Sequence, residues 1–334
     1  MTVNKFEHKH SAHCESGVMS AMLRHHGLDL SEPMVFGLAN ALTFAYLPFV
    51  KMGGMPLVTY RNIPKSIVKN ISKTLKIKMN LETFSNKEKA QLRLDELLQS
   101  GKIVAAQTSV YWLPYFPPEM RFHFNAHNLI VYAKENGTYK ISDPVFEHTV
   151  EADENDMLKA RFAKGVMAPK GLLYYPTYVP EQIDLKPLIA KSIKKVAKSM
   201  LKTPVPIAGL KGIAYLAKTI SKLDKKDKRY AKLFLGNIVR MQEEIGTGGA
   251  GFRYIYASFL QEASAIFNNH KTLQTASSMM LEVGDSWREF ALMIAKAIKS
   301  KQDIDYKTIA DKLLSIKNEE ALVYKKMLEF NGNN

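Results

Sequence analysis

The sequence contains almost no cysteine, too few acidic residues to balance its lysines, and no long apolar run. Its 334 residues include one cysteine, Cys14, which excludes intramolecular disulfides and a zinc site built on several thiolates. No stretch of about 18 uncharged apolar residues is present, so we expect no membrane-spanning helix. The first residues lack the apolar core of a signal peptide, and we therefore expect a cytoplasmic protein.

The remaining composition is that of a globular protein. The chain is 46% hydrophobic and 24% charged, which excludes intrinsic disorder, and its length predicts about two domains. Its 47 Lys+Arg exceed 32 Asp+Glu, and the net charge of +15 predicts an acidic partner. The cations gather late in the chain: residues 191–232 contain thirteen of them and only two aspartates. Eight of the nine histidines lie before residue 150.

The apolar spacing predicts an α+β first domain, residues 1–178. Helices are expected from Cys14 to near Gly27, from Ser31, and from a capping box at Ser85. Apolar runs rich in β-branched residues then predict antiparallel strands. These runs cover residues 102–111, 127–133 and 138–142.

The second domain, residues 179–334, is predicted to be all-α. One apolar face with lysines opposite it predicts an amphipathic helix over 188–200. Further helices are expected at about 211–222, 228–244, 252–268, 274–299 and 306–330.

Cys14 stands directly before a predicted helix, a position that favours a reactive thiol. The N-terminus of a helix carries a partial positive charge, which stabilises the thiolate, the nucleophilic form of cysteine. The alternative is a buried and unreactive cysteine, which is the common case for a single cysteine in a cytosolic protein.

His127 begins a predicted strand, and Asp143 follows the next strand, sixteen residues later. Cysteine, then histidine, then a carboxylate or amide is the chain order of papain-like cysteine enzymes. In such enzymes the imidazole takes the thiol proton and the acid orients the imidazole. The order therefore favours a nucleophilic Cys14.

The turn between the two strands decides whether this pair can meet. A two-residue turn at 136–137 would place Asp143 on the opposite face of the sheet from His127. A three-residue loop over 135–137 would place Asp143 opposite Leu129, on the face of His127. We predict the second register.

Short motifs early and late in the chain resemble one protein family. Those before residue 146 resemble the butirosin biosynthesis protein H family, and the later ones resemble the helical domain of unknown function often found behind it. The motifs are Phe6-Glu7-His8, His13-Cys14-Glu15-Ser16, His26-Gly27, Leu30-Ser31-Glu32-Pro33-Met34-Val35-Phe36-Gly37-Leu38, Leu113-Pro114-Tyr115 with His127 and Asp143, and Gly246-Thr247-Gly248-Gly249-Ala250-Gly251-Phe252-Arg253 with Tyr256, Phe259-Leu260 and Glu262-Ala263.

The resemblance implies a papain-like fold related to the bacteriocin-leader peptidases. It also implies an acyltransferase, since the type member of the family transfers an aminoacyl group from an acyl carrier protein to an aminoglycoside amine. Carried over, Cys14 is the nucleophile, His127 the base and Asp143 the orienting acid. The related peptidases place an oxyanion-hole glutamine about six residues before the cysteine, where this sequence has His8, so we expect the backbone N–H of Cys14 to be a donor.

Seven further residues are candidates for substrate binding. Glu32 follows the family pattern, although a glutamate at this position also suits the start of a helix. An aromatic run at 111–116 would exclude water, or would be ordinary core. The glycine-rich run 246–251 lacks P-loop spacing, but its N–H groups and a following arginine would bind an anion unless the run is only a tight turn. These candidates are Glu32, Tyr111, Trp112, Tyr115, Gly248, Gly249 and Arg253.

His8, His10, His13 and Cys14 also invite a zinc site. Structural zinc sites usually join two separate segments, and a thiolate bound to zinc would lose its nucleophilic role. We therefore predict no metal and no resident cofactor; 4′-phosphopantetheine would arrive on the partner protein.

The sequence thus predicts a cysteine acyltransferase of secondary metabolism. It would move an acyl or aminoacyl group from an acidic acyl carrier protein, through acyl-Cys14, to a small-molecule amine or hydroxyl. The basic segment 191–232 would dock the carrier, although a solvated helix face is the commoner origin of such a run. Lysine dominates this segment and stacking aromatics do not alternate with it, which disfavours nucleic acid.

Two alternatives stay open at this point. One is a cysteine peptidase or amidase on the same fold. The other is a non-catalytic module that binds a carrier protein. The sequence also leaves open whether the chain forms a homo-oligomer.

Overall fold

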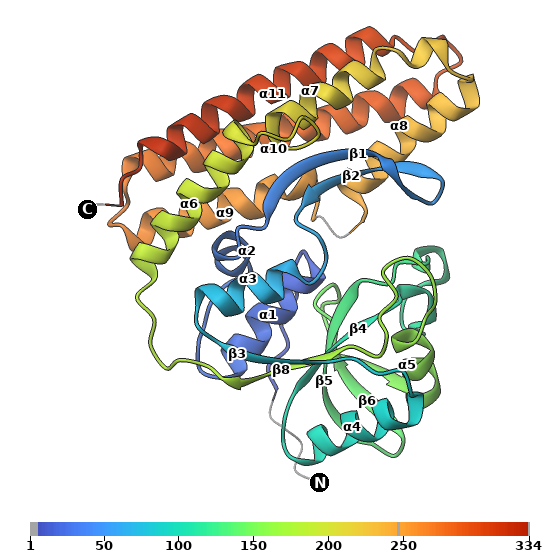
Figure 1. Ribbon diagram of the computed structural model, residues 1–334, viewed down its shortest axis with the longest axis vertical. Coiled ribbons are helices and arrows are strands. Elements are labelled where there is room, and N and C mark those ends of the chain that lie inside the picture. The colour runs from blue at the N-terminus through green and yellow to red at the C-terminus, as the bar shows by residue number, and fades with distance from the viewer. Residues whose placement is uncertain (1–5, 246–247, 333–334) are drawn as a thin grey trace. The chain divides into compact units, whose positions relative to one another are not determined.

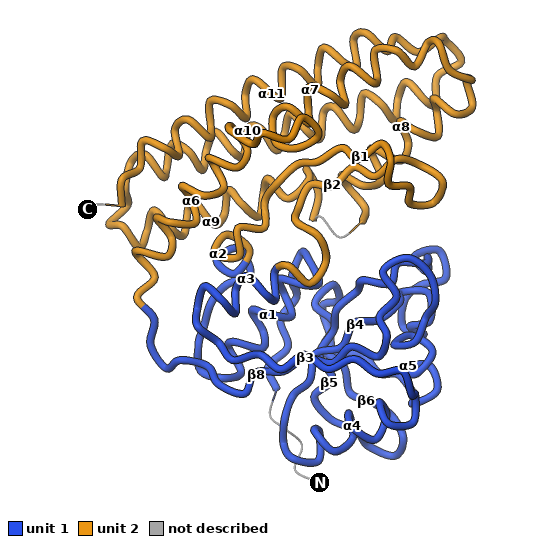
Figure 2. Tube along the Cα trace, in the orientation of Figure 1, with its two compact units in different colours: residues 1–35, 67–183 blue, residues 36–66, 184–334 orange. Residues whose placement is uncertain are grey.

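The computed structural model describes residues 6–245 and 248–332, which form two compact units. Unit 1 contains residues 1–35 and 67–183, and unit 2 contains residues 36–66 and 184–334 (Figure 2). The sequence predicts one boundary, after residue 178. The chain instead leaves unit 1 at residue 36, contributes a hairpin to unit 2, and returns to unit 1 at residue 67.

Unit 1 combines helices with a six-stranded sheet, which confirms the predicted α+β class (Figure 1). The strand order is β3-β8-β4-β5-β6-β7, and every neighbouring pair is antiparallel. Helix α1 packs against β5. The elements, including α2 and α3 at the two crossings between units, are α1 (Cys14–His25), α2 (Glu32–Leu38), α3 (Ser66–Thr74), β3 (Lys78–Glu82), α4 (Lys87–Gln99), β4 (Val104–Thr108), the short 3-10 turns η1 (Val110–Trp112) and η2 (Pro118–Met120), β5 (His127–Glu135), β6 (Thr138–Ser142), β7 (Val150–Asp153), α5 (Glu154–Arg161) and β8 (Leu173–Tyr178).

The central strands β4 and β5 are buried, and most of their buried side chains are small or apolar. All five residues of β4 are buried, as are the first five of β5. Alternate residues of the sheet join Leu94 and Leu97 of α4 in one apolar cluster. The helix begins after Asn86, whose side chain accepts from the N–H of Lys89 at 2.7 Å. The helix thus starts one residue later than the predicted cap at Ser85.

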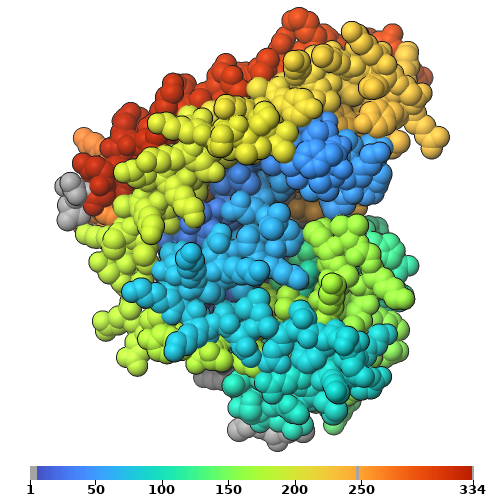
Figure 3. All heavy atoms as spheres, in the orientation of Figure 1, coloured from blue at the N-terminus to red at the C-terminus, as the bar shows by residue number. Residues whose placement is uncertain are grey.

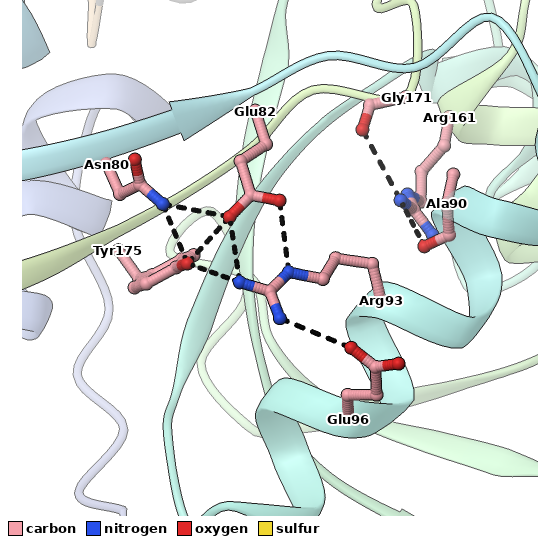
Figure 4. Close-up of polar contacts among 8 residues, drawn as sticks. All are labelled: Asn80, Glu82, Ala90, Arg93, Glu96, Arg161, Gly171 and Tyr175. Carbon is pink, nitrogen blue, oxygen red and sulfur yellow. Dashed lines mark hydrogen bonds and ion pairs between the residues drawn. The ribbon is translucent and has the colours of Figure 1, made fainter.

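Polar side chains connect α4 to β3 and β8, the edge strand of the sheet and its neighbour (Figure 4). Arg93 donates to both carboxylate oxygens of Glu82, at 3.0 and 3.2 Å, and to the hydroxyl of Tyr175. Asn80 donates to the same hydroxyl at 2.7 Å. Arg161 is buried nearby and donates to two backbone carbonyls. Burial lowers the pKa of Arg161 to about 10.

Unit 2 is mainly helical, as the sequence predicts for this part of the chain. The helix ends differ from the predicted ones by three residues or fewer. Within the described ranges, no helix has the length and apolar character needed to cross a membrane. The elements after residue 184 are α6 (Leu185–Lys202), α7 (Gly209–Ile220), η3 (Leu223–Lys225), α8 (Lys228–Glu243), η4 (Ala250–Phe252), α9 (Arg253–Ile266), α10 (Lys271–Lys299) and α11 (Tyr306–Glu329).

A β-hairpin also belongs to the helical unit, and the all-α prediction does not include it. Strand β1 (Leu42–Met52) pairs with β2 (Met55–Arg61) across two glycines with positive φ. The hairpin rings of Phe44 and Tyr60 pack on Trp287 of α10, at centroid distances of 5.9 and 5.3 Å. The strands thus supply large aromatic side chains to the core of a unit that is distant in sequence.

The amphipathic prediction for α6 is confirmed. Its apolar residues Ile189, Ile193, Val196 and Met200 are buried, and its lysines from residue 191 onward are exposed. All thirteen Lys and Arg side chains between residues 191 and 232 are exposed. Part of this segment is visible in yellow-green and yellow in Figure 3. Among the ion pairs of the described residues, only that of Lys228 with Asp303 involves this segment.

Candidate functional site

Cys14 is the first residue of α1, and the chain enters this helix through a tightly bonded loop. His13 is the N-cap, with extended backbone angles, and its Nδ1 accepts from the N–H of Ser16. Glu32 accepts from the N–H groups of Ala12 and His13, both at 2.8 Å, and from the hydroxyl of Ser16 at 2.9 Å. Cys14 therefore has a fixed backbone at the positive end of a helix dipole.

The predicted substrate-binding residue Glu32 thus supports the loop before Cys14. Burial raises the pKa of its carboxyl group, and its three hydrogen bonds oppose this shift. The hydrogen bonds of Glu32 to the loop before Cys14 account for its burial without contact with a substrate.

Gly17, one turn into α1, permits a close approach between this helix and the segment after Asp143. A Cβ atom at position 17 would lie 2.6 Å from Cβ of Ser11 and 2.8 Å from Cβ of Pro144. The N–H of Ser11 donates to the carbonyl of Pro144 at 2.6 Å. The glycine is required here by space, because its φ is not in the left-handed region.

The β5–β6 hairpin has the predicted final register but reaches it differently. Glu135 pairs with Thr138, so the turn has two residues, not the predicted three. Both turn residues have positive φ, 48° and 79°, as in a type I′ turn. An irregularity between Val131 and Ala133 then absorbs one residue, and Ile130 pairs with Ser142. The next position, residue 143, therefore reaches the level of residue 129.

The structure brings Cys14, His127 and Asp143 together, as the sequence predicts. Nε2 of His127 lies 2.6 Å from Oδ2 of Asp143. Cys14 is one of the groups that raise the pKa of the same ring, and because Nε2 is engaged by Asp143, we infer that Nδ1 faces the thiol. The three residues are 3%, 4% and 0% exposed, respectively.

The charge state of His127 is set by two opposing effects. Burial lowers its pKa, but the negative charge and hydrogen bond of Asp143, together with Cys14, outweigh burial and raise the pKa to about 10. The imidazole is therefore held as imidazolium at neutral pH. This is the partner that a thiolate requires.

Asp143 is held from three sides. Its Oδ2 also accepts from the hydroxyl of Tyr115 at 2.9 Å, and its Oδ1 accepts from the N–H of Val145 at 3.2 Å. Burial, and then the charge of Asp143, raise the pKa of Tyr115 well above its usual value, so its hydroxyl stays a donor. Tyr115 was a candidate for substrate binding, and its position makes it a support of Asp143. Phe116 packs edge-on against the ring of His127 at 5.4 Å.

The other two aromatic candidates are exposed. Tyr111 and Trp112 are 40% and 39% exposed. Tyr111 stacks on His123 at 4.1 Å, and Lys159 lies over the ring of Trp112. Within residues 6–245, neither the Tyr111 ring nor the Trp112 ring has a ring or cation contact with Cys14.

The remaining candidates, Gly248, Gly249 and Arg253, belong to unit 2. Both glycines have positive φ, which fits the tight-turn interpretation of this run; residues 246 and 247 lie outside the described residues. Arg253 is fully buried, and its guanidinium is paired with Glu320 at 2.8 Å. Its charge is thus already neutralised within unit 2, and we do not include it in the proposed site.

His8 occupies the position where the resemblance places a glutamine, and both of its ring nitrogens are occupied. Its Nδ1 lies 2.7 Å from the hydroxyl of Ser142, and its Nε2 lies 3.0 Å from the carbonyl oxygen of Phe146. It therefore helps to anchor the segment before α1 to the end of β6. Among residues 6–245 and 248–332, no group of three His, Cys, Asp or Glu side chains is arranged to hold a metal ion.

Two residues at the site, Asn128 and Tyr174, were not among the sequence candidates. Nδ2 of Asn128 lies 3.9 Å from Sγ of Cys14, and its Oδ1 accepts from the hydroxyl of Tyr174 at 3.1 Å. Asn128 could have been identified from the sequence, because two polar residues, His127 and Asn128, stand together at the start of an otherwise apolar strand. Tyr174 lies on β8, whose pairing with β4 the sequence does not reveal.

Two family models match the chain. Residues 13–144 match the model described as butirosin biosynthesis protein H, N-terminal. Residues 155–327 match the model described as a domain of unknown function, DUF4872. The first match contains Cys14, His127 and Asp143, and the two together confirm the family resemblance read from the sequence.

No curated protein matches this chain. Among solved structures, one similar chain is a protein from Bacillus anthracis described as a C39-like peptidase. It is 13% identical with a TM-score of 0.38, and the match covers 53% of this chain and 98% of that chain. At this level of similarity, the comparison supports no conclusion about this protein.

Proposed function

We propose, for a chain that belongs to the DUF4872 family and carries the N-terminal domain of butirosin biosynthesis protein H, a cysteine-dependent acyl transfer. One observation carries the proposal: a buried Cys14 that raises the pKa of His127, whose Nε2 is held by Asp143 at 2.6 Å. A thiol, a titratable nitrogen and an orienting carboxylate in this order form an activated nucleophile.

The first half-reaction transfers the acyl group to the enzyme. The thiolate of Cys14 attacks the carbonyl carbon of a thioester, and a tetrahedral intermediate with a negatively charged oxygen forms. The bond from that carbon to the leaving sulfur then breaks. The imidazolium of His127 gives its proton to the departing thiolate, which leaves acyl-Cys14, a free thiol and a neutral imidazole.

The second half-reaction restores the starting state. An amine or hydroxyl attacks the carbonyl carbon of acyl-Cys14, and neutral His127 takes its proton. The bond between carbon and Sγ breaks, so the thiolate–imidazolium pair forms again. Asp143 keeps the ring orientation throughout, because its carboxylate is fixed by Tyr115 and Val145.

The proposed donor is an acidic acyl carrier protein bearing the acyl group on its own 4′-phosphopantetheine. Membership of the family supports this choice, and so do the thirteen exposed cations of residues 191–232. Opposite charges speed the encounter of two proteins even where they add little to affinity. The acceptor is proposed to be a small-molecule amine or hydroxyl.

Hydrolysis is the second candidate function. The same three residues would serve a peptidase or amidase, in which water attacks acyl-Cys14 in the second half-reaction. A non-catalytic carrier-binding module is a third. The acceptor separates the first two, and Cys14→Ala separates both from the third, because it would leave a binding function intact.

The first experiment is alkylation of Cys14 by iodoacetamide as a function of pH, followed by intact mass. Cys14 is the only thiol in the chain, so the signal has one source. An ordinary thiol titrates near about 8.5. We expect fast labelling at pH 6 that is lost in His127→Ala. A profile unaffected by this substitution, or a thiol that reacts only after denaturation, would exclude the nucleophile.

The second experiment uses an acylated carrier protein. We expect a mass increase of one acyl group on the wild-type chain, and its discharge by an added amine. Discharge by water alone, with no amine product, would favour hydrolysis over transfer.

A further inference from the structure

The tetrahedral intermediate of the proposed reaction needs hydrogen-bond donors for its oxygen. Such donors are effective when they are fixed in advance, about 2.7–3.1 Å from the position that the oxygen will occupy. The Cys14 backbone N–H, at the first position of α1, is one candidate. His8 cannot be the second: one ring nitrogen must donate to the carbonyl of Phe146, which leaves the other as the acceptor from Ser142.

Asn128 has an amide group fixed beside the sulfur. Its Oδ1 accepts from the hydroxyl of Tyr174 at 3.1 Å. Its Nδ2 donates one hydrogen to the carbonyl of Ala126 at 3.0 Å and directs the other toward Sγ of Cys14 at 3.9 Å. The side chain is buried, so water does not compete for these hydrogens.

The contacts also determine which end of the amide faces the sulfur. With the amide reversed, Oδ1 would face the carbonyl oxygen of Ala126, and two acceptors would meet with no hydrogen between them. The Tyr174 hydroxyl keeps its proton, because burial, and then the nearby charges of Glu15 and Cys14, raise its pKa well above the usual value. The donor of Asn128 is thus directed at the reacting atom by its neighbours.

We propose that Asn128 is the side-chain donor to the oxyanion and that Tyr174 is its positioning residue; this inference rests on the proposed function. An oxygen on a carbon bonded to Sγ lies closer to the sulfur than Nδ2 does. A donor 3.9 Å from Sγ can therefore stand at hydrogen-bond distance from that oxygen. In the resting state, the same hydrogen points at the sulfur.

The test compares two reactions of the same thiol. Iodoacetamide alkylates Cys14 by displacement of iodide and forms no oxyanion, whereas a p-nitrophenyl ester acylates it through a tetrahedral intermediate. We expect Asn128→Ala to slow acylation by about 10²- to 10³-fold. Because its amide also points at the sulfur in the resting state, the rate of alkylation should change too, but far less. Asn128→Leu, which keeps a similar size without charge and lacks the N–H donors, should behave alike. Tyr174→Phe should slow acylation less than Asn128→Ala does, and should again affect acylation more than alkylation.

A matched control exists in the same unit. Asn80 of β3 and Tyr175 of β8 form a second asparagine–tyrosine contact, at 2.7 Å (Figure 4). Asn80→Ala and Tyr175→Phe should change neither reaction. Thermal unfolding of each variant checks that it is folded, and the ratio of the two rates remains informative in a variant that is less stable.

Two results would overturn the inference. Equal losses of acylation and alkylation would mean that Asn128 acts on the thiolate and not on the oxyanion. No loss of either would mean that it acts on neither. A wild-type chain that reacts with the ester but not with an acylated carrier would refute the proposed donor and leave the role of Asn128 standing; a chain that accepts neither would refute both.

Discussion

Each unit of this protein buries an ion pair among aromatic rings, but only one pair adjoins a reactive atom. In unit 1, His127 and Asp143 lie 2.6 Å apart beside Phe116. In unit 2, Arg253 and Glu320 lie 2.8 Å apart, and the guanidinium stacks near the rings of Tyr60 and Trp287. Burial, charge and aromatic neighbours are thus common to both, and cannot by themselves identify a catalytic site.

The difference lies in what each pair can exchange. The Glu320 carboxylate accepts from Arg253, Trp287 and Tyr324, and a guanidinium stays protonated under ordinary conditions. The pair in unit 2 therefore holds three segments together. The pair in unit 1 contains an imidazole, which can gain and lose a proton, and the thiol of Cys14 helps to raise the pKa of that imidazole. A titratable nitrogen next to a nucleophile is the feature that separates the two.

Replacing the nucleophile should give the largest effect. We expect Cys14→Ala to lower acyl transfer by at least about 10⁴-fold, because no other residue can carry the acyl group. The thermal unfolding midpoint should change little. Intact mass after incubation with an acylated carrier measures the adduct. An acylated Cys14→Ala chain would place the nucleophile elsewhere.

Removing the orienting charge comes next. Asp143→Asn keeps the shape but removes the charge that raises the pKa of His127, so this pKa should fall from about 10. We expect transfer to drop by about 10³- to 10⁴-fold and alkylation at neutral pH to slow. Tyr115→Phe, which removes only a donor to the same carboxylate, should cost far less. Equal rates for Asp143→Asn and the wild type would break the proposed assignment.

Breaking the pair in unit 2 should affect stability instead. Removing one partner of a buried ion pair costs about 3–5 kcal/mol, so Glu320→Ala should lower the unfolding midpoint markedly. Alkylation of Cys14 should keep its pH profile in the folded variant. Glu329→Ala, at an exposed ion pair with Lys326, is the control and should change little. A shifted alkylation profile in Glu320→Ala would contradict the assignment of a purely structural role to the pair in unit 2.

The two pairs should also differ in how stability depends on pH. The pKa of His127 is about 10 in the folded chain and about 6.5 when unfolded, so folding favours the protonated ring. Its contribution is complete below about pH 6.5 and declines as the pH rises through about 10. The difference in unfolding midpoint between wild type and His127→Gln should shrink over this range, whereas that for Glu320→Ala should not. Parallel curves for the two variants would contradict this.

Surface charge should have the smallest effect. Replacing the exposed Lys194 and Lys198 of α6 by Glu should slow transfer from a carrier protein by about tenfold at low salt, and less at high salt. Turnover of a p-nitrophenyl ester should not change. The same replacement at the exposed Lys296 and Lys325, outside the basic segment, is the control. An equal loss at both pairs would mean that net charge, not this segment, matters.

The sequence predicts those parts of the site that depend on local signals. The helix after Cys14 and the strand at His127 are read from spacing, and their positions agree with the structure. The β5–β6 register was also predicted, but for the wrong reason. A bulge near Tyr132 is not encoded by any short pattern, because it is fixed by the packing of the whole sheet.

Features formed by distant segments could not be predicted in this way. The hairpin over 42–61 joins the helical unit because its aromatic rings fit against Trp287, and nothing in the hairpin sequence names that partner. Arg253 looks like an anion ligand until Glu320, sixty-seven residues later, is placed beside it. Tyr174 reaches Asn128 only because β8 pairs with β4.

The β5–β6 hairpin also limits how this protein can change by insertion and deletion. The number of residues between His127 and Asp143 depends on the length of the turn and on the extra residue of the bulge. Together these two features keep Asp143 on the same face of the sheet as His127. Losing one residue in either place would turn Asp143 away, and a second change of one residue would be needed to restore it. We expect viable length changes here to occur in compensating pairs, so that relatives without the bulge would carry a three-residue turn.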